Sequence, residues 1–307
     1  MRSMQNIGFI GLGAMGAGMA ANLLRAGFAV TGFDLRQDTL ERLVEQGGTG
    51  AASPRAAAEG AALLILMVVN DAQVEAVLFG AEGALETLPP GATVVLSSTV
   101  PAGYVRDLGE RLAARGFELL DAPVSGGAIG AERGQLTVMA SGSPAAFAAA
   151  EAALEVCARQ MHRLGEAPGI GSTVKAVNQL LAGINLVTAA EGMAFGAALG
   201  ADPKVLYEVI RNAAGGSWMF ENRVPHMLDD DYSPRSAVDI WVKDLGLVLD
   251  TGRTLKMPLP MAAAAYQVVM MAAAQGLGPI DDAGFVKVYE SFTGAKVAGP
   301  DDRDKRG

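Results

Sequence analysis

The sequence is poor in the side chains that form disulfides and metal sites. It contains one cysteine, Cys157, and two histidines, His162 and His226. One cysteine cannot form an intrachain disulfide, and the set is too small for a cysteine-based or histidine-based zinc site. We therefore expect no metal, and we expect Cys157 to be a small buried apolar side chain.

Positive charge is also scarce, since 24 lysines and arginines stand against 33 aspartates and glutamates, for a formal net charge of −9. A chain this acidic has no broad basic face for a phosphate backbone, so we expect no nucleic-acid partner. The longest apolar run, residues 61–69, is far short of the roughly 18 residues that span a bilayer. With no signal-peptide pattern at its start, the chain is expected to be cytoplasmic and to have no membrane partner.

The first part of the chain predicts strands and helices in alternation. Short apolar segments typical of buried parallel strands lie at residues 7–10, 28–33, 63–69, 93–96 and 117–120. Segments with helical periodicity lie between them, at residues 15–25, 37–46, 73–78 and 102–115. This alternation predicts an α/β fold, in which a Rossmann-like doubly wound parallel sheet carries helices on both faces.

The strand signal ends near residue 165, and the rest of the chain predicts helices. Pro203 opens one helix, with Asp202 as its cap. The other expected helices lie at residues 169–199, 241–253 and 261–274.

Two domains follow from this change of pattern, and 307 residues are long enough for both. We expect a Rossmann-like dinucleotide-binding domain over residues 1–167. An all-α C-terminal domain for substrate binding and oligomerisation is expected over residues 168–307, beginning with a long interdomain helix. Its last residues, 299–307, are expected to be frayed.

The first predicted strand runs into a glycine-rich turn that opens a predicted helix. In that context G-x-G-x-x-G is typical of a dinucleotide site, because the first glycine allows the tight turn and the second lets a pyrophosphate approach. The third glycine allows close packing of helix on strand, and the helix N-terminus offers free N–H groups to phosphates. The residues of the turn are Gly11, Leu12, Gly13, Ala14, Met15 and Gly16.

Asp34 follows the second predicted strand, about 20 residues beyond the turn, as the dinucleotide motif requires. A carboxylate there accepts hydrogen bonds from ribose hydroxyls and repels a 2′-phosphate, which favours NAD over NADP, although Arg36 can soften that preference. Val69 and Asn70 end the third predicted strand and Thr99 follows the fourth, at the strand ends where such sheets bind ligands. We expect all three at the cofactor, with a turn or helix cap as the alternative for Asn70 and Thr99.

A serine and two glycines follow the last predicted strand, as Ser125, Gly126 and Gly127. Their accessible N–H groups and the serine hydroxyl can hold a substrate carboxylate. The alternative interpretation is a flexible turn.

Lys175 lies in the long predicted helix, where residues three and four apart share a face. Gly171, Lys175, Asn178 and Gln179 therefore form one stripe. Partial burial lowers the proton affinity of a lysine and makes it a usable acid or base. We expect Lys175 to take the hydroxyl proton in oxidation, with Asn178 or Gln179 orienting it or holding the substrate; the alternative is an ordinary surface lysine.

Four segments occur in a fixed order: GFIGLGAMGAGMAANLLRAG, DAPVSGGAIGAERGQLTVMASG, GSTVKAVNQLLAG and WVKDLGLVLD. Together they resemble the β-hydroxyacid dehydrogenase family, which includes 3-hydroxyisobutyrate, tartronate semialdehyde and 6-phosphogluconate enzymes. The resemblance covers nearly the whole chain. It implies an oxidoreductase that transfers a hydride from a small hydroxy acid to NAD.

The resemblance also implies roles for matching positions. It places the cofactor at the glycine turn and Asp34, the substrate at residues 125–127, and catalysis at Lys175. It further implies that Lys243, in the last segment, lies near the nicotinamide. Many family members carry asparagine four residues after the catalytic lysine, where this chain has Gln179, and this difference implies a reshaped substrate pocket.

Residues 171–183 and 217–250 are most similar to the subgroup that oxidises L-threonate, a four-carbon sugar acid, at C2 with NAD. A 3-hydroxyisobutyrate dehydrogenase and a tartronate semialdehyde reductase stay open as alternatives. A non-catalytic dinucleotide-binding scaffold and an imine reductase are other classes, but the resemblance implies that both have lost the lysine that this chain keeps. Family members generally oligomerise through their helical domains, so we expect a homo-oligomer, either a dimer or a tetramer.

Overall fold

The computed structural model describes residues 6–298, and the chain forms two compact units, Met1–Ala176 and Val177–Gly307. The domain boundary expected between residues 167 and 168 stays a prediction. The tail expected to be frayed, residues 299–307, lies outside the described residues.

The first unit is built on a sheet whose strands follow the order β3-β2-β1-β4-β5-β6-β8-β7, with β9 beside β8. The strands from β3 to β6 are all parallel, so the predicted Rossmann-like sheet is confirmed. Their bounds are β1 (Asn6–Ile10), β2 (Ala29–Phe33), β3 (Thr49–Gly50), β4 (Leu63–Leu66), β5 (Thr93–Leu96), β6 (Glu118–Asp121), β7 (Val124–Ser125), β8 (Leu136–Ser141) and β9 (Ala158–Gly165).

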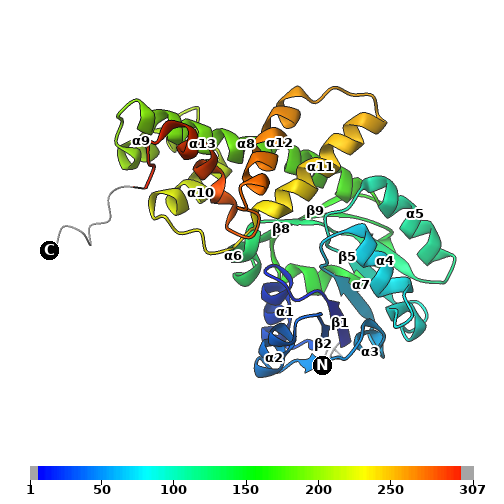
Figure 1. The fold of residues 1–307 in the computed structure, drawn as a ribbon. Coiled ribbons are helices and arrows are strands. Elements are labelled where there is room, and N and C mark those ends of the chain that lie inside the picture. The colour runs from blue at the N-terminus through cyan, green and yellow to red at the C-terminus, as the bar shows by residue number, and fades with distance from the viewer. Residues whose placement is uncertain (1–5, 299–307) are drawn as a thin grey trace. The chain divides into compact units, whose positions relative to one another are not determined.

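Helices lie on both faces of this sheet (Figure 1). Alternate residues of β4 show why the strand is wholly apolar: Leu63 packs in one core cluster with α1 and α7, and Leu64 packs in the other with α4 and α5. The helices of this unit are α1 (Gly16–Arg25), α2 (Gln37–Glu45), α3 (Pro54–Ala58), α4 (Asp71–Phe79), η1 (Ala84–Glu86), α5 (Ala102–Ala113), α6 (Gly127–Glu132) and α7 (Pro144–Glu155).

Two features of the sheet differ from the sequence prediction. The strand expected over residues 63–69 ends at Leu66, and the next residues turn out of the sheet. The strands β3, β7, β8 and β9 were not predicted; β8 runs antiparallel to β6 and β7, and β9 is parallel to β8. β9 was hidden because its sequence, ARQMHRLG, is polar and half exposed, without the alternation that marks a strand.

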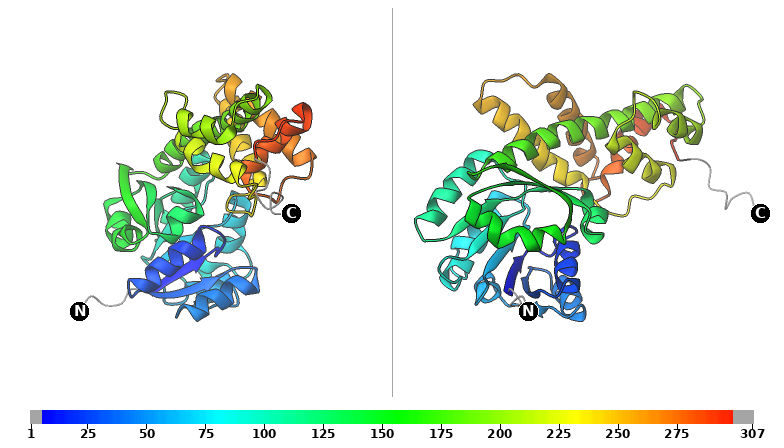
Figure 2. Two further views of the ribbon diagram at one scale, coloured as in Figure 1. Left: turned by 90° about the vertical axis from the view of Figure 1, so that its left-hand side faces the viewer. Right: turned by 180° about the vertical axis from the view of Figure 1, so that it is seen from behind.

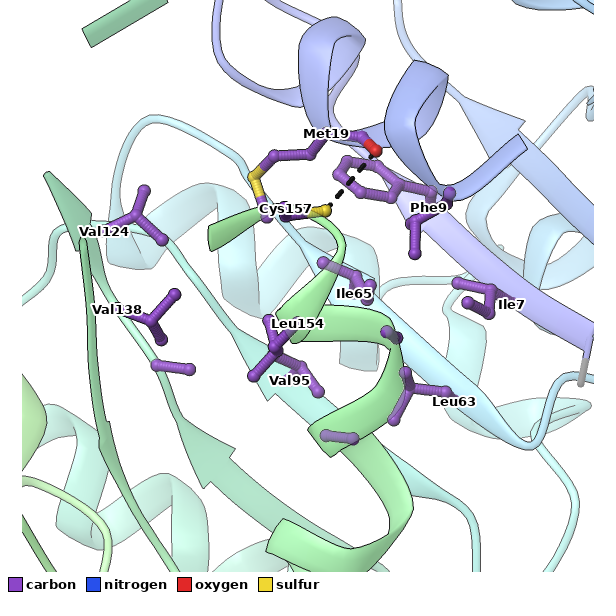
Figure 3. Packing of buried hydrophobic residues seen from close by; sticks show 14 of the residues in the cluster. Ile7, Phe9, Met19, Leu63, Ile65, Val95, Val124, Val138, Leu154 and Cys157 are labelled. Carbon is purple, nitrogen blue, oxygen red and sulfur yellow. Dashed lines mark hydrogen bonds between the residues drawn. The ribbon is translucent and has the colours of Figure 1, made fainter. Parts of the chain in front are cut away.

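The buried thiol of Cys157 lies in the first core cluster of this unit, among Met19, Phe9 and Leu154 (Figure 3). Its Sγ lies 3.6 Å from the Met19 carbonyl oxygen, and the residue is 0% exposed. Burial raises the pKa of the Cys157 thiol to about 12. The expectation of a small, inert, buried side chain is therefore confirmed.

The second unit is helical. One long helix, α8 (Ile170–Ala198), is present where the sequence predicted a helix over residues 169–199 (Figure 2). Asp202 caps the next helix, because its side chain accepts hydrogen bonds from the N–H groups of Lys204 and Val205. The helices that follow are α9 (Pro203–Ile210), α10 (Trp218–Leu228), α11 (Val238–Thr254), α12 (Pro260–Ala274), η2 (Asp282–Gly284) and α13 (Phe285–Thr293).

The helix α8 is long and apolar enough, by length and composition alone, to cross a membrane, with a mean hydropathy of 1.4 over 18 residues. Core helices of soluble proteins meet the same criterion. Several α8 side chains, among them Leu186, Ala190 and Met193, are 0% exposed in the core cluster of the helical unit. We therefore interpret α8 as a core helix.

Candidate active site

The predicted cofactor residues of the first unit lie at the carboxyl ends of neighbouring strands. The glycine turn follows β1, Asp34 follows β2, and Val69 and Asn70 follow β4. The strand order reverses at β1, which lies between β2 and β4. Open parallel sheets bind ligands at such a switch point, outside the carboxyl ends of the strands.

The three glycines of the turn have different surroundings. Gly11 has a φ of +96°, and a Cβ there would lie 2.4 Å from the Met67 carbonyl oxygen. A Cβ on Gly16 would lie 1.8 Å from the carbonyl oxygen of Gly11, so only glycine lets α1 start here. A Cβ on Gly13, in contrast, would meet nothing within 4 Å. The open space beside Gly13 fits the pyrophosphate of a dinucleotide, as the motif requires.

The carboxylate of Asp34 is tied to this turn. Its Oδ2 accepts a hydrogen bond of 2.7 Å from the Leu12 N–H, and its Oδ1 accepts one of 2.9 Å from the Arg36 N–H. The Arg36 guanidinium also lies 3.7 Å from Oδ1. Leu12 itself is 1% exposed, so its side chain belongs to the core and only its backbone faces the turn. Sequence reasoning gave Asp34 a ribose contact and missed its bond to the turn.

The ends of β4 and β5 are joined by a hydrogen bond of 3.0 Å from the Val68 N–H to Ser98 Oγ. Asn70 Oδ1 accepts a hydrogen bond from the Gln73 N–H, so its side chain caps α4, as one of the two interpretations expected. Val69 is 47% exposed. The structure thus brings Asn70 and Thr99 to adjacent strand ends, and their roles at a cofactor stay predictions.

The loop that carries Ser125, Gly126 and Gly127 is more ordered than a flexible turn. Ser125 belongs to β7, which pairs with β8, and Gly127 begins α6. Gly126 and Gly127 have φ values of +135° and +66°, which L-residues rarely adopt. The two glycines therefore turn the chain from β7 directly into α6.

The helix α6 packs directly on the dinucleotide helix α1. A Cβ on Gly18 would lie 2.6 Å from the Glu132 backbone nitrogen, so the two backbones nearly touch. The buried amide of Asn22 donates a hydrogen bond of 2.6 Å to the Ala131 carbonyl oxygen. The cofactor turn and the substrate loop are thereby joined through their helices, a connection that sequence reasoning missed.

A buried carboxylate, Asp121, lies at the end of β6 and holds the start of α8. Its Oδ2 accepts hydrogen bonds from the N–H groups of Gly169 and Ser172, at 2.9 and 2.8 Å. Its Oδ1 accepts one of 2.7 Å from Ser172 Oγ. Burial raises the pKa of Asp121, although the hydrogen bonds from Ser172 and Gly169 oppose that rise. Sequence reasoning gave Asp121 no role. The feature that could have pointed to it is the position of a charged residue at the end of an apolar strand.

Lys175 lies on α8, one turn beyond this anchored start, and is 7% exposed. This burial rules out the interpretation as an ordinary surface lysine. Gly171, on the same stripe, is needed for close packing, since its Cβ would lie 2.3 Å from the Met139 carbonyl oxygen. A buried lysine amine on a fixed helix can hold or release a proton, which is the chemistry that an alcohol oxidation requires.

In the second unit, side-chain amides and charges form a continuous chain. Asn178 Nδ2 donates to Gln179 Oε1 at 2.9 Å, and Gln179 Nε2 donates to Asp244 Oδ2 at 2.5 Å. The Lys243 ammonium lies 2.7 Å from the other oxygen of Asp244. Close packing at Gly183, whose Cβ would lie 2.8 Å from the Leu245 side chain, makes the Gln179 contact reachable.

Three of the predicted residues, Asn178, Gln179 and Lys243, are therefore brought together by Asp244. Asp244 is 3% exposed and was not predicted as a site residue. A charged side chain on an otherwise apolar face of α11 was the signal that could have found it.

Two family models match almost the whole chain between them. Residues 6–165 match the NAD binding domain of 6-phosphogluconate dehydrogenase. Residues 169–289 match the NAD-binding region of NADP-dependent 3-hydroxyisobutyrate dehydrogenase.

Close relatives span nearly the full length. The chain is 53% identical to L-threonate dehydrogenase of Cupriavidus necator, over 93% of this chain and 96% of the relative. It is 46% identical to L-threonate dehydrogenase of Escherichia coli strain K12, over 95% and 97%. A crystal structure described as 3-hydroxyisobutyrate dehydrogenase from Salmonella typhimurium superposes with a TM-score of 0.87 at 45% identity, covering 92% of this chain and 99% of that one.

Proposed function

The chain belongs to the 3-hydroxyisobutyrate dehydrogenase-like family of NAD-dependent hydroxy-acid dehydrogenases, and we propose that it oxidises L-threonate at C2 to 2-oxo-tetronate. The observation that carries the substrate is the identity of 46% to 53% with relatives named for this activity. The buried Lys175 on α8 carries the mechanism, because it supplies the proton acceptor that the oxidation needs.

In this proposal Lys175 acts as the general base. Its neutral amine takes the proton of the C2 hydroxyl as the C2–H bond breaks and the C=O bond forms. NAD held at the glycine turn and Asp34 would supply the hydride acceptor for C2, so that the two electrons lost by the substrate would be gained by the cofactor. In the reverse direction the Lys175 ammonium polarises the carbonyl and returns the proton.

The other residues position the reactants. We assign the substrate carboxylate to Ser125 and the backbone N–H groups of Gly126 and Gly127, because the segment lies between β7 and α6 and its glycines have no side chain to shield the backbone. Asn178 and Gln179 are assigned to the substrate hydroxyls, with Gln179 oriented by Asp244.

The cofactor is assigned to the strand-end edge of the first unit. Gly13 leaves room for the pyrophosphate, and Asp34 favours a ribose with a free 2′-hydroxyl. The remaining assigned contacts are Gly11, Leu12, Ala14, Met15, Gly16, Val69, Asn70, Thr99 and Lys243.

A second candidate substrate is 3-hydroxyisobutyrate, and the observation that favours it is the name given to the Salmonella structure. Tartronate semialdehyde reduction is the same chemistry in the opposite direction. These candidates differ from L-threonate in the number of hydroxyl groups that the pocket must bind. The amide pair Asn178 and Gln179 favours the polyol, because its members donate and accept hydrogen bonds.

We further propose that the enzyme is a cytoplasmic homo-oligomer. The helical unit exposes large apolar side chains that suit an interface between copies, and the acidic chain suits neither nucleic acid nor an anionic membrane surface. The exposed apolar residues are Phe195, Leu199, Val205, Val209 and Met261.

The test follows NADH formation at 340 nm with NAD and, in turn, L-threonate, D-threonate, D-erythronate, 3-hydroxyisobutyrate and D-glycerate. Each is run with wild type and with Lys175→Ala. We expect selective turnover of L-threonate and a loss of about 100-fold or more in kcat for Lys175→Ala, which removes the general base.

The outcomes separate the parts of the proposal. Turnover limited to 3-hydroxyisobutyrate or glycerate would keep the mechanism and discard the substrate. An unchanged kcat in Lys175→Ala would discard the mechanism. Binding of NADH by wild type, measured by its fluorescence, is the control that shows a competent cofactor site.

A further inference from the structure

The first N–H groups of an α-helix have no partner within the helix, and in α8 their partners come from distant strand ends. Gly169 N–H and Ser172 N–H donate to Asp121 at the end of β6. Gly171 N–H donates to Ser141 Oγ at the end of β8, at 3.0 Å. Asp121 and Ser141 are register partners in the sheet. The start of α8 is thus fixed at three amides by two paired strand residues.

The helix is also seated closely on those strands. A Cβ on Gly171 would lie 2.3 Å from the Met139 carbonyl oxygen and 2.8 Å from that of Asp121. Asp121 and Ser172 are 0% and 1% exposed, so water does not compete for their hydrogen bonds. A larger side chain at position 171 would lift α8 away from the sheet.

We propose that Asp121 is the positioning residue of Lys175, an inference that rests on the proposed catalytic role of that lysine. Ser172 and Lys175 are three residues apart, which corresponds to about 4.5 Å along a helix and most of one turn. Because Asp121 binds both the backbone and the hydroxyl of Ser172, it fixes the height and the rotation of α8 where Lys175 leaves it.

The Asp121 carboxylate also lies just before the loop of Ser125, Gly126 and Gly127. Asp121 ends β6, and Ser125 follows four residues later in β7. One group therefore sets the distance between the loop assigned to the substrate carboxylate and the helix that bears the base. Misplacement of a reacting group by about 1 Å can cost about 100-fold in rate, so a residue that fixes this distance matters to kcat.

The experiment compares Asp121→Asn, Asp121→Ala and Ser172→Ala with Ser143→Ala as the matched control. Ser143 is the N-cap of α7 in the same unit, where its Oγ accepts from the Ala146 N–H and donates to Glu118 Oε2, and neither partner belongs to α8. Its loss removes one helix cap without touching the lysine helix. Asp121→Asn keeps the shape and one acceptor oxygen, so it tests the carboxylate if the alanine variant fails to fold.

Five readouts are measured on the full chain. Amide exchange in the peptide that covers residues 169–173 reports the anchor itself. The kcat and KM with NAD and L-threonate report function, and the isotope effect on kcat with C2-deuterated L-threonate reports hydride transfer. The Kd for NADH and the melting temperature show whether the cofactor site and the fold are intact.

We expect faster exchange at residues 169–173 in all three test variants and not in Ser143→Ala. The kcat should fall about 10-fold in Asp121→Asn and about 100-fold in Asp121→Ala, with a larger isotope effect and an unchanged Kd for NADH. Ser143→Ala should lower the melting temperature and keep kcat within about two-fold, since it loses a helix cap and the bond to Glu118, both away from α8.

Faster exchange with kcat unchanged in Asp121→Asn and Asp121→Ala would overturn the proposal, because the anchor would then be structural only. Unchanged exchange would overturn it as well. Full activity in Lys175→Ala would refute instead the catalytic role of Lys175 on which this proposal rests, and the exchange data would still decide whether Asp121 holds α8.

Discussion

At the scale of single residues, one carboxylate often accepts hydrogen bonds from two different groups. Asp34 accepts hydrogen bonds from the backbone of the glycine turn and of residue 36, so it shapes the turn before any ribose binds. The sequence could predict Asp34 from its position after the second strand. It could not predict the bond to Leu12, because that bond depends on how the turn closes over the strand end.

Asp34→Asn is expected to weaken NAD binding and to raise the activity with NADP relative to NAD. The substitution removes the charge that repels a 2′-phosphate and weakens a charge-assisted hydrogen bond worth about 1.5–3 kcal/mol, so the KM for NAD should rise about 10-fold or more. Steady-state kinetics with both cofactors measure this. The control is Asp38→Asn, an equal charge change at an exposed residue of α2; equal shifts in both variants would contradict the role of Asp34.

At the scale of elements, the six-residue turn between β1 and α1 contains glycines with different roles, one needed for the fold and another assigned to ligand binding. Gly16 is required by the fold, because a Cβ there would overlap the Gly11 carbonyl oxygen. Gly13 is free of such contacts, and we assign its lack of a side chain to the approach of a ligand. Both roles were predictable from the motif, but which glycine tolerates a methyl group was visible only in the structure.

Gly13→Ala should therefore fold normally and bind NADH poorly, whereas Gly16→Ala should lose both stability and binding. We expect the melting temperature of Gly13→Ala to stay within about 2 °C of wild type, which corresponds to about 0.5–1 kcal/mol for a unit of this size. Thermal unfolding and fluorescence titration with NADH measure the two effects. Tight NADH binding by Gly13→Ala would show that no pyrophosphate approaches this backbone.

In the helical unit, Asp281 joins α10 to η2 by hydrogen bonds with His226 Nδ1 and the Ala283 N–H. Its burial acts to raise the pKa of Asp281, but the hydrogen bonds from His226, Ala283 and Arg235 outweigh burial and hold that pKa below its usual range. A lowered pKa in the folded state stabilises the protein above the unfolded value of about 3.9, and that stability is lost as the pH falls through the folded value.

Asp281→Asn should be less stable than wild type by about 1–3 kcal/mol at pH 7, because an acceptor of several buried donors is weakened. It should also lose less stability than wild type between about pH 5 and pH 2. Urea unfolding can be followed by tryptophan fluorescence, since Trp218 and Trp241 both lie in this unit. The control is Asp229→Asn, a change at an exposed residue. An equal loss of unfolding free energy with falling pH in wild type and Asp281→Asn would contradict the lowered pKa of Asp281.

Most long elements could be predicted from their apolar patterns, because α8 and the strands β1, β2, β4, β5 and β6 bury apolar side chains. The short or polar elements could not, and β9 and α6 are examples: one is polar along its length, and the other is six residues long and begins at a glycine. Lys175 and Gln179 could be found as one stripe of a helix. Asp121, which holds the start of that helix, and Asp244, which binds Gln179, could not be found, because both are distant in sequence.

At the scale of the whole molecule, large apolar side chains remain exposed on the helical unit. Phe195 and Leu199 near the end of α8 are 65% and 70% exposed, and Val205 and Val209 on α9 are 60% and 58% exposed. Such exposure on an otherwise charged protein is typical of a surface that associates.

Sedimentation equilibrium should therefore give a mass of at least twice the 31.5 kDa of one chain. The double variant Phe195→Lys with Val209→Lys should lower that mass, because buried unpaired ammonium groups oppose association. Asp250→Lys, a charge change of similar kind at an exposed position of α11, serves as the control. A monomeric wild type would refute the proposed homo-oligomer.

The contact between α1 and α6 has a consequence for recombining this enzyme with its relatives. Gly18 and Asn22 meet Glu132 and Ala131 at distances that leave no room for an added methyl group. A chimera that takes its N-terminal βαβ segment from another dehydrogenase must then import the stretch around residues 127–134 from the same donor. In such a shuffling experiment the N-terminal βαβ segment and the stretch around residues 127–134 must be exchanged together. Crossover points chosen from the sequence alone would separate these two segments.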